Sequence, residues 1–162
     1  MTNIKKALIL MTLMSLTACS QESGPKAEQE FMAIIKEMQA SYSDAEKIHN
    51  DILADKAVRT GKERLFDASH NVEGWTAEVV EISDVFGVMI EAKNKDVTFK
   101  MIMVNPDSKK LANNLKRGDE ILFSGELGHE SSFTDYGTVT NPEFAFTPKF
   151  IYKKGDVDKI AQ

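Results

Sequence analysis

The feature that most constrains this chain is a change in the spacing of its apolar residues near residue 75. Before that point, apolar side chains recur three and four residues apart, which is the period of an amphipathic helix. After it, short runs rich in β-branched and aromatic residues alternate with turn residues, as strands do. We therefore expect an α+β protein that is mainly β, with a helical region followed by a β-rich domain.

In the helical region we expect one long helix from about Ala27 to Asp55, with an extension to Phe66 that Gly61 disfavours. Its apolar stripe consists of Phe31, Ile35, Met38, Tyr42, Ala45, His49 and Ile52. Two questions stay open. Residues 43–46, Ser-Asp-Ala-Glu, have the pattern of a capping box that would start a second helix. The stripe either packs against the β-rich domain of the same chain, which we favour, or forms a coiled-coil contact with a partner.

In the β-rich region we expect three strands, one short helix and then two more strands. The strands are predicted at 75–83, 88–92, 97–104, 120–127 and 143–152, and the helix at 108–115. The polar residues 93–96 predict a hairpin turn between the second and third strands. Pro106 is expected to end the third strand, because proline cannot donate to a central ladder.

One run in this region carries a specific resemblance. Leu115-Lys-Arg-Gly-Asp-Glu-Ile-Leu-Phe-Ser-Gly125, placed after the short helix, resembles the fourth strand of an OB-fold. The Pro142-Glu-Phe-Ala-Phe146 strand, after a loop rich in Ser, Thr and Gly, is similar to small proteobacterial lipoproteins with OB-like domains, a group without an assigned activity. The resemblance covers roughly 74–153 and implies a five-stranded Greek-key barrel with a short helix between strands three and four. It brings no catalytic residue with it, and a fold alone does not give a function.

The N-terminus predicts where the protein resides. Lys5 and Lys6 precede an apolar run, 7–16, whose helical length of about 15 Å is too short to cross a hydrocarbon core of about 30 Å. This is the pattern of a secretory signal. Leu16-Thr17-Ala18-Cys19 then resembles the lipobox of bacterial lipoproteins. In that family the cysteine sulfur receives a diacylglyceryl group, the leader is cut before the cysteine, and the new amino group is acylated.

The resemblance to the lipobox implies a membrane anchor, because a lipid-carrying Cys19 with more than one acyl chain binds a bilayer stably. Ser20 stands where lipoproteins retained at the inner membrane usually have Asp, so the resemblance implies the outer membrane. Whether the domain faces the periplasm or the cell surface stays open. The organisation we expect is a signal peptide at 1–18, a tether at 19–26, a helical region at 27–73, a barrel at 74–153 and a tail at 154–162.

Net charge and cysteine content limit which classes of function and which sources of stability the chain can have. Cleavage before Cys19 would remove 18 of the 162 residues and leave 144, with 18 basic and 25 acidic side chains and a net charge of −7. Proteins that bind nucleic acid are more often basic. Cys19 is the only cysteine, so the chain cannot form an internal disulfide, and its stability must come from packing.

No catalytic or metal-binding pattern is evident. The histidines His49, His70 and His129 lack the spacing of a metal site. The chain has neither a Gly-x-Ser-x-Gly nucleophile elbow nor a Gly-x-x-x-x-Gly-Lys phosphate loop. Glu130 and Asp135 flank a loop, where carboxylates are usually solvated. We therefore predict a protein that is not an enzyme and needs no cofactor or metal.

Two regions are candidates for binding. Phe133 and Tyr136 lie in the long loop 128–141, which borders the usual ligand side of an OB-fold, but this loop could equally fold back over the barrel. Phe86 and Lys100 would serve a stacking platform for single-stranded nucleic acid. Phe99 alternates with Lys100, so we expect Phe99 to face the core.

We predict an accessory module of the envelope that binds a protein or another envelope component. The alternatives are an oligonucleotide-binding OB-fold and an exclusion or inhibitor lipoprotein at the cell surface. The first alternative is disfavoured by the acidic charge and by the predicted outer-membrane location. The sequence does not predict the oligomeric state.

Overall fold

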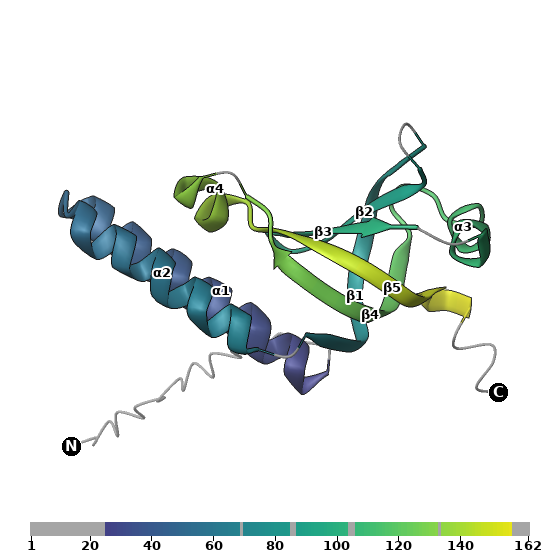
Figure 1. Cartoon of the computed structure of the whole chain (residues 1–162), viewed down its shortest axis with the longest axis horizontal. Coiled ribbons are helices and arrows are strands. Elements are labelled where there is room, and N and C mark those ends of the chain that lie inside the picture. Colours follow the sequence, from purple (N-terminus) through teal and green to yellow (C-terminus); the bar gives the residue numbers. More distant parts are fainter. Residues whose placement is uncertain (1–24, 69, 85–86, 104–105, 133, 157–162) are drawn as a thin grey trace, which may run out of the picture.

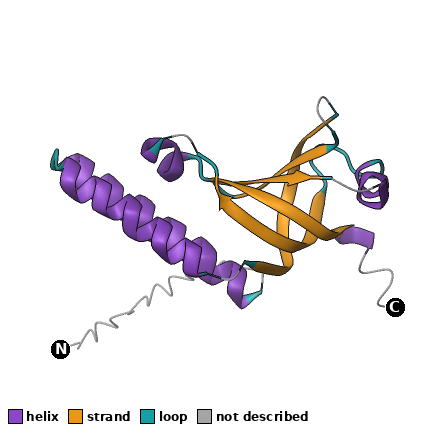
Figure 2. Ribbon diagram, in the orientation of Figure 1, coloured by secondary structure: helices purple, strands orange, loops and turns teal. Residues whose placement is uncertain are grey.

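A helical hairpin and a β-barrel make up the protein (Figures 1 and 2). The computed structural model describes residues 25–68, 70–84, 87–103, 106–132 and 134–156. The helices are α1 (Lys26–Lys47), α2 (Asp51–Asp67), α3 (Pro106–Ala112) and α4 (Asp135–Thr140). The strands are β1 (Asn71–Ser83), β2 (Met89–Asn94), β3 (Val97–Ile102), β4 (Glu120–Glu130) and β5 (Glu143–Lys153). The prediction of a helical region followed by a five-stranded domain is confirmed.

The five strands form a closed barrel in the order β1-β2-β3-β5-β4, with β4 returning to pair with β1. Neighbouring strands are antiparallel except β3 and β5, which are parallel. The helix α3 lies between β3 and β4 in the chain. This strand order and helix position are those of an OB-like Greek-key barrel, as the sequence predicted.

Aromatic side chains fill the barrel. Strand residues point alternately inward and outward, so every second position reaches the core. Trp75, Phe99, Phe123 and Phe146 are all fully buried, and the Phe99 ring lies 5.1 Å from that of Phe123. The prediction that Phe99 and not Lys100 faces the core is confirmed.

The prediction of one continuous helix is wrong, because the chain reverses between α1 and α2. His49 adopts a left-handed backbone conformation with φ of 53°. Asn50 then caps α2, and its side-chain oxygen accepts a hydrogen bond from Leu53 N at 3.1 Å. An Asn cap satisfies an orphan N–H of the new helix, which favours a start at Asp51 over continuation of α1. The question left open at residues 43–46 is answered against a capping box, because those residues lie inside α1.

The apolar stripe of α1 is buried within the protein, but mainly against α2. Four stripe residues, Phe31, Ile35, Met38 and Ala45, are buried. The last two predicted members do not belong to the stripe: His49 is exposed in the turn, and Ile52 is 81% exposed. The reversal at residue 49 ends the helical period, so residues beyond it no longer follow the face of α1.

The N-terminal part of α1 joins the hairpin to the barrel. The ring of Phe31 lies 5.0 Å from that of Trp75 and 5.1 Å from that of Phe144. Glu28 is buried beside it and accepts hydrogen bonds from Thr76 and Asn94. A helix that precedes the barrel in sequence therefore contributes a side chain to the barrel core.

Two segments differ from prediction near the loops. Pro106 does not merely end β3 but opens α3, where a missing N–H and a fixed φ suit the first turn of a helix. The segment 128–141, predicted to be a loop, contains the end of β4 and the helix α4. Thr134 caps α4, accepting a hydrogen bond from Gly137 N at 3.0 Å.

Candidate functional site

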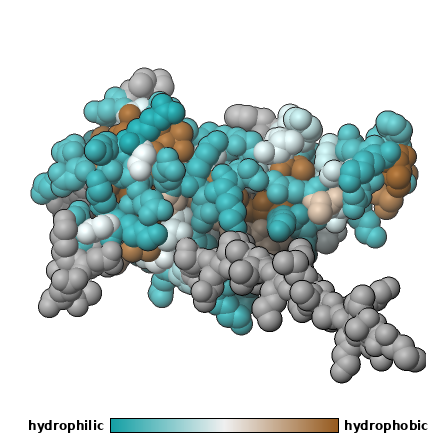
Figure 3. All heavy atoms as spheres, turned by 180° about the vertical axis from the view of Figure 1, so that it is seen from behind, coloured by the Kyte–Doolittle hydropathy of each residue, from teal (hydrophilic) through white to brown (hydrophobic). Residues whose placement is uncertain are grey.

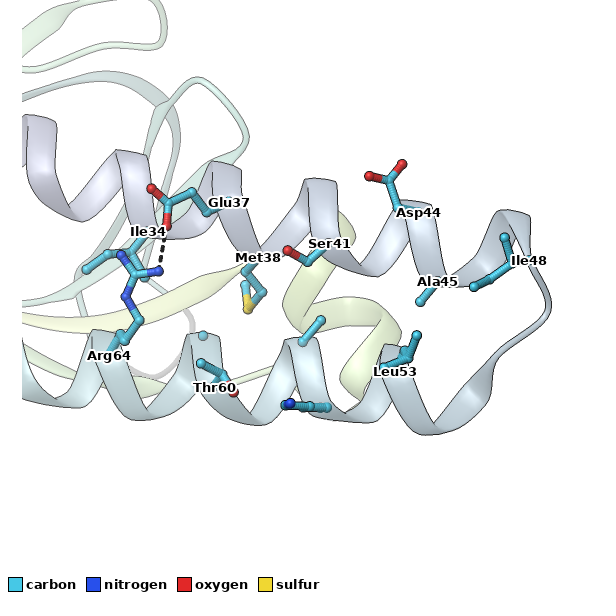
Figure 4. A pocket seen from close by; sticks show the side chains of 13 residues that line it. Ile34, Glu37, Met38, Ser41, Asp44, Ala45, Ile48, Leu53, Thr60 and Arg64 are labelled. Atoms are coloured by element: carbon cyan, nitrogen blue, oxygen red, sulfur yellow. Dashed lines mark hydrogen bonds and ion pairs between the residues drawn. The ribbon is translucent and has the colours of Figure 1, made fainter.

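A groove of about 420 Å³ runs along one face of the helical hairpin, between α1 and α2 (Figure 4). Its floor is apolar and is formed by Ile34, Met38, Ala45, Ala57 and Gly61. The groove follows the two helices to the turn between them. A groove of this form fits an elongated apolar partner, because helix-in-groove recognition places one apolar helix face along such a floor.

Gly61 allows the two helices to approach closely at the groove floor. A Cβ atom added at Gly61 would lie 2.4 Å from Met38 Sδ and 2.9 Å from Met38 Cβ. A larger residue there would require the Met38 side chain or one of the two helices to move. The sequence suggested that Gly61 would weaken a helix, whereas its position in α2 reflects this close contact.

The rims of the groove carry opposite charges. Glu37 and Asp44 line it from α1, whereas Lys56 and Arg64 line it from α2. Glu37 forms an ion pair with Arg64 across the groove, as Figure 4 shows. Ser41 and Thr60 lie between the charged positions as small polar groups. The floor can therefore bind apolar side chains while the two rims distinguish acidic from basic partner groups.

The tip of the hairpin exposes large apolar side chains. Ile48 is 64% exposed and Leu53 is also exposed, and both line the groove at its tip end. Figure 3 shows an apolar patch at this end of the molecule, besides others elsewhere on the same face. Contiguous exposed apolar side chains of this kind often mark interaction sites.

The opposite face of the hairpin is covered by α4. Gln39 Nε2 donates a hydrogen bond to Val139 O at 2.8 Å, and Lys62 Nζ lies 3.3 Å from Asp135 Oδ1. Tyr42 lies on this covered face, and its partial burial, together with the negative charge of Glu46, raises the pKa of its phenol. The groove thus opens on the face of the hairpin that α4 does not cover.

The predicted binding residues do not form one site. Tyr136 is on α4 and is 65% exposed. Lys100 is on β3 and forms an ion pair with Glu143 at the start of β5. Phe86 and Phe133 lie outside the described residues, as does the predicted lipidation residue Cys19. The helix α4, which carries Tyr136, packs on the hairpin through Val139, and its Thr138 also donates a hydrogen bond to Glu130 at the end of β4.

The outer surface of β2 and β3 offers little for base stacking in the part that the structure describes. Its outward residues pair across the strands as Met89 with Ile102, Glu91 with Lys100, and Lys93 with Thr98, of which Thr98 is buried. None of these is aromatic, and Lys100 is already paired with a carboxylate. Binding of single strands to an OB-fold depends on stacked aromatics along a basic groove, so this surface gives the oligonucleotide alternative no support.

A smaller hollow of about 210 Å³ lies where α2 meets β4. Phe66 stacks on His129, with ring centroids 5.8 Å apart, and meets His70 edge-on. Lys62 Nζ lies 3.7 Å from Glu130 Oε2 at its edge. Among residues with described positions, no group of three metal-binding side chains comes together. We interpret this hollow as a packing contact between hairpin and barrel.

Sequence reasoning missed the α2 half of the groove, including Lys56, Thr60 and Arg64. The signal was present at Asn50-Asp51, because Asn followed by an acidic residue is a typical helix start. The apolar period continued across this position and masked the cap. Recognition of the cap would have predicted a hairpin, and with it a second wall for the groove.

Comparison of the chain with models of known protein families and with curated proteins gave no match. Within the described ranges, no helix combines the length and the apolar character needed to cross a membrane.

Proposed function

We propose that this chain is a lipid-anchored lipoprotein of the bacterial outer membrane that acts as a non-enzymatic binding module without a cofactor. The lipobox-like sequence ending in Cys19 supports the anchor. The observation that carries the binding function is the apolar, open groove between α1 and α2. In this proposal its ligand is a protein of the envelope, and the barrel serves as the rigid base that holds the hairpin.

The energetics of the groove favour a protein ligand. Burying a Leu or Ile side chain that would otherwise face water contributes about 1.5–3 kcal/mol, and Ile48 and Leu53 are both exposed at the groove end. The floor is long and the rims carry charges of both signs. An amphipathic helix supplies apolar side chains for the floor and charged side chains for the rims.

The predicted anchor would keep the groove close to the membrane. Six residues, 20–25, separate Cys19 from Lys26 at the start of α1, and a fully extended chain over those seven residue steps spans at most about 25 Å. The 22 residues of α1 then extend about 33 Å. A partner on the membrane or near it would lie within reach of the groove.

Photo-crosslinking in intact envelopes tests the binding function. A photoreactive residue placed at Ser41 or at Thr60 is expected to capture a partner protein, because both positions line the groove. The same residue at Ser43, which is exposed on α1 but does not line the groove, serves as the matched control. Capture at Ser43 equal to that at Ser41, or no capture from the groove, would contradict the proposal.

A further inference from the structure

We propose that the groove binds the groove of a second copy of this chain, so that two hairpins form a four-helix bundle. The inference rests on the proposed function and names its partner. The two-fold axis runs parallel to the hairpin and places α1 of each copy over α2 of the other. This arrangement follows from the charges of the rims and from the levels of the groove residues, that is, their positions along the hairpin axis.

Two contacts fix the register of α1 and α2. Glu37 and Arg64 lie at one level, because they form an ion pair across the groove. Met38 lies at the level of Gly61, because the two are in contact. One turn nearer the tip, Ser41 therefore lies opposite Thr60, and a further turn brings Asp44 to the level of Lys56 and Ala57, since the helices are antiparallel.

Two symmetric arrangements can bring the groove faces of two copies together. A closed dimer uses the same patch on both copies. When two hairpins meet face to face, the two-fold axis runs either along the helices or across them. An axis along the helices places α1 over the partner's α2 at unchanged levels. An axis across the helices reverses one hairpin and places α1 over the partner's α1.

The rim charges discriminate between the two axes. With the axis along the helices, the acidic wall of one copy (Glu37 and Asp44) faces the basic wall of the other (Lys56 and Arg64). With the axis across them, acidic residues face acidic residues and basic residues face basic ones. Like charges brought together across an interface disfavour that arrangement and so specify the other. The apolar floor and the side chains at the tip supply the affinity.

The proposed anchor favours the same axis. An axis along the hairpin keeps the starts of both α1 helices, at Lys26, at one end of the bundle, where two lipid anchors enter a single membrane. The opposite hairpin face is covered by α4, through Gln39 and Val139. The second copy can therefore dock on the groove face while the contact between hairpin and α4 stays intact.

Cysteine crosslinking of the full-length protein in intact membranes tests this arrangement. Two differently tagged chains, Ser41→Cys and Thr60→Cys, are expressed together and oxidised. We expect a disulfide between the two chains, because position 41 of one copy faces position 60 of the other within the short Cβ distance that a disulfide needs. The wild-type chain, which carries only Cys19, gives the background, and Ser43→Cys paired with Thr60→Cys is the matched control.

The outcomes of the two crosslinking experiments distinguish the dimer, its symmetry axis and the binding function. A Ser41–Thr60 crosslink well above that of the Ser43 control supports the dimer. Crosslinking of Ser41→Cys chains to each other overturns it in favour of the crossed axis. If no homodimer forms but the photoreactive groove positions capture a different protein, the dimer fails while the proposed binding function stands. If neither forms, both proposals fail.

A charge exchange supplies a second measurement. Glu37→Lys is expected to reduce the yield of the Ser41–Thr60 crosslink several-fold, because it places Lys beside Arg64 of both copies. Adding Arg64→Glu exchanges the two charges and is expected to restore the yield. A yield unchanged by Glu37→Lys, or not restored by the exchange, would overturn the proposed pairing of the walls.

Discussion

Glu28 is a carboxyl group buried where the hairpin meets the barrel, and it is only 3% exposed. Its Oε1 accepts hydrogen bonds from Thr76 N at 2.9 Å, Thr76 Oγ1 at 3.1 Å and Asn94 Nδ2 at 2.8 Å. Burial raises the pKa of Glu28 above its usual value, and the hydrogen bonds oppose this only in part. Its Oε2 has no hydrogen-bond partner among the described residues, which leaves the charged form poorly compensated.

The raised pKa of Glu28 predicts a loss of stability as pH rises. The folded protein holds the Glu28 proton to a higher pH than the unfolded chain does, so this contribution is complete below the unfolded pKa of about 4.5 and is lost as pH rises through the folded pKa. Glu28→Gln keeps an acceptor for Thr76 and Asn94 but cannot ionise. We expect it to flatten the pH dependence of the free energy of unfolding, measured by urea denaturation between pH 4.5 and 8.

The comparison with wild type at each pH cancels the contribution of the other titrating groups. Wild type should lose more stability than the Glu28→Gln variant over this range. Parallel pH profiles for the two proteins would show that Glu28 ionises in the folded protein as easily as in the unfolded chain.

Trp75 is the largest side chain of the barrel core and is 1% exposed. Its ring contacts those of Phe31, Phe99 and Phe123. Trp75→Ala is expected to lower the free energy of unfolding by about 3–5 kcal/mol, because it removes a large buried ring and leaves a cavity. Phe150→Ala, at an exposed position on β5, is the control and should cost less than about 1 kcal/mol. A similar loss for both variants in denaturant unfolding would contradict this packing.

The packing of α1 against α2 includes a close contact at one small residue, Gly61. Gly61 permits the contact with Met38, and a glycine inside a helix costs roughly 1 kcal/mol relative to alanine. The close approach of α1 and α2 therefore outweighs helix propensity at this position. The same contact fixes the position of α1 relative to α2 along the hairpin axis.

Gly61→Val is expected to destabilise the protein by about 1–3 kcal/mol, because its Cβ would overlap Met38 and push the helices apart. Thr60→Val, which introduces the same residue at the neighbouring exposed position, is the control and should have little effect. Thermal unfolding of both variants provides the measurement. An unchanged melting temperature for Gly61→Val would mean that α1 and α2 are not held in this close contact.

The arrangement of hairpin and barrel matters at the scale of the whole molecule. The hairpin extends away from the barrel (Figure 1). Its groove lies on the face not covered by α4. Phe31 and Glu28 fix the base of α1 to the barrel. The barrel thereby gives the hairpin a fixed base, and the predicted lipid at Cys19 would attach the protein to the membrane near this base.

Cys19→Ala tests the anchor for the protein as a whole. The lipid forms a thioether with the cysteine sulfur, so the variant is expected to carry no lipid and to keep its leader uncut by the lipoprotein peptidase. Membrane fractionation and the mass of the intact protein report both changes. Cys19→Ser is the matched control, since it keeps the size but not the thiol, and should behave as the alanine variant does. Normal processing and anchoring of either variant would refute the lipid anchor.

Much of the barrel could be predicted from sequence, because its determinants are local. Strand periodicity, the turn at 93–96 and the run from Leu115 to Gly125 identified five strands and their order along the chain. The alternation of Phe99 and Lys100 predicted which side chain would be buried. Periodicity is set by backbone geometry and therefore appears in any sequence that forms a regular element.

The candidate site required the tertiary structure. The turn at His49 and Asn50 brings α2 back along α1, and only then do Glu37 and Arg64 meet and Met38 contact Gly61. The folding of α4 onto the hairpin leaves one face of the hairpin open. By itself the sequence predicted the five strands, the short helix between β3 and β4, and a membrane anchor, since each of these predictions depends on residues close together in the chain. Which surfaces lie open was decided by contacts between distant residues, which local spacing does not encode.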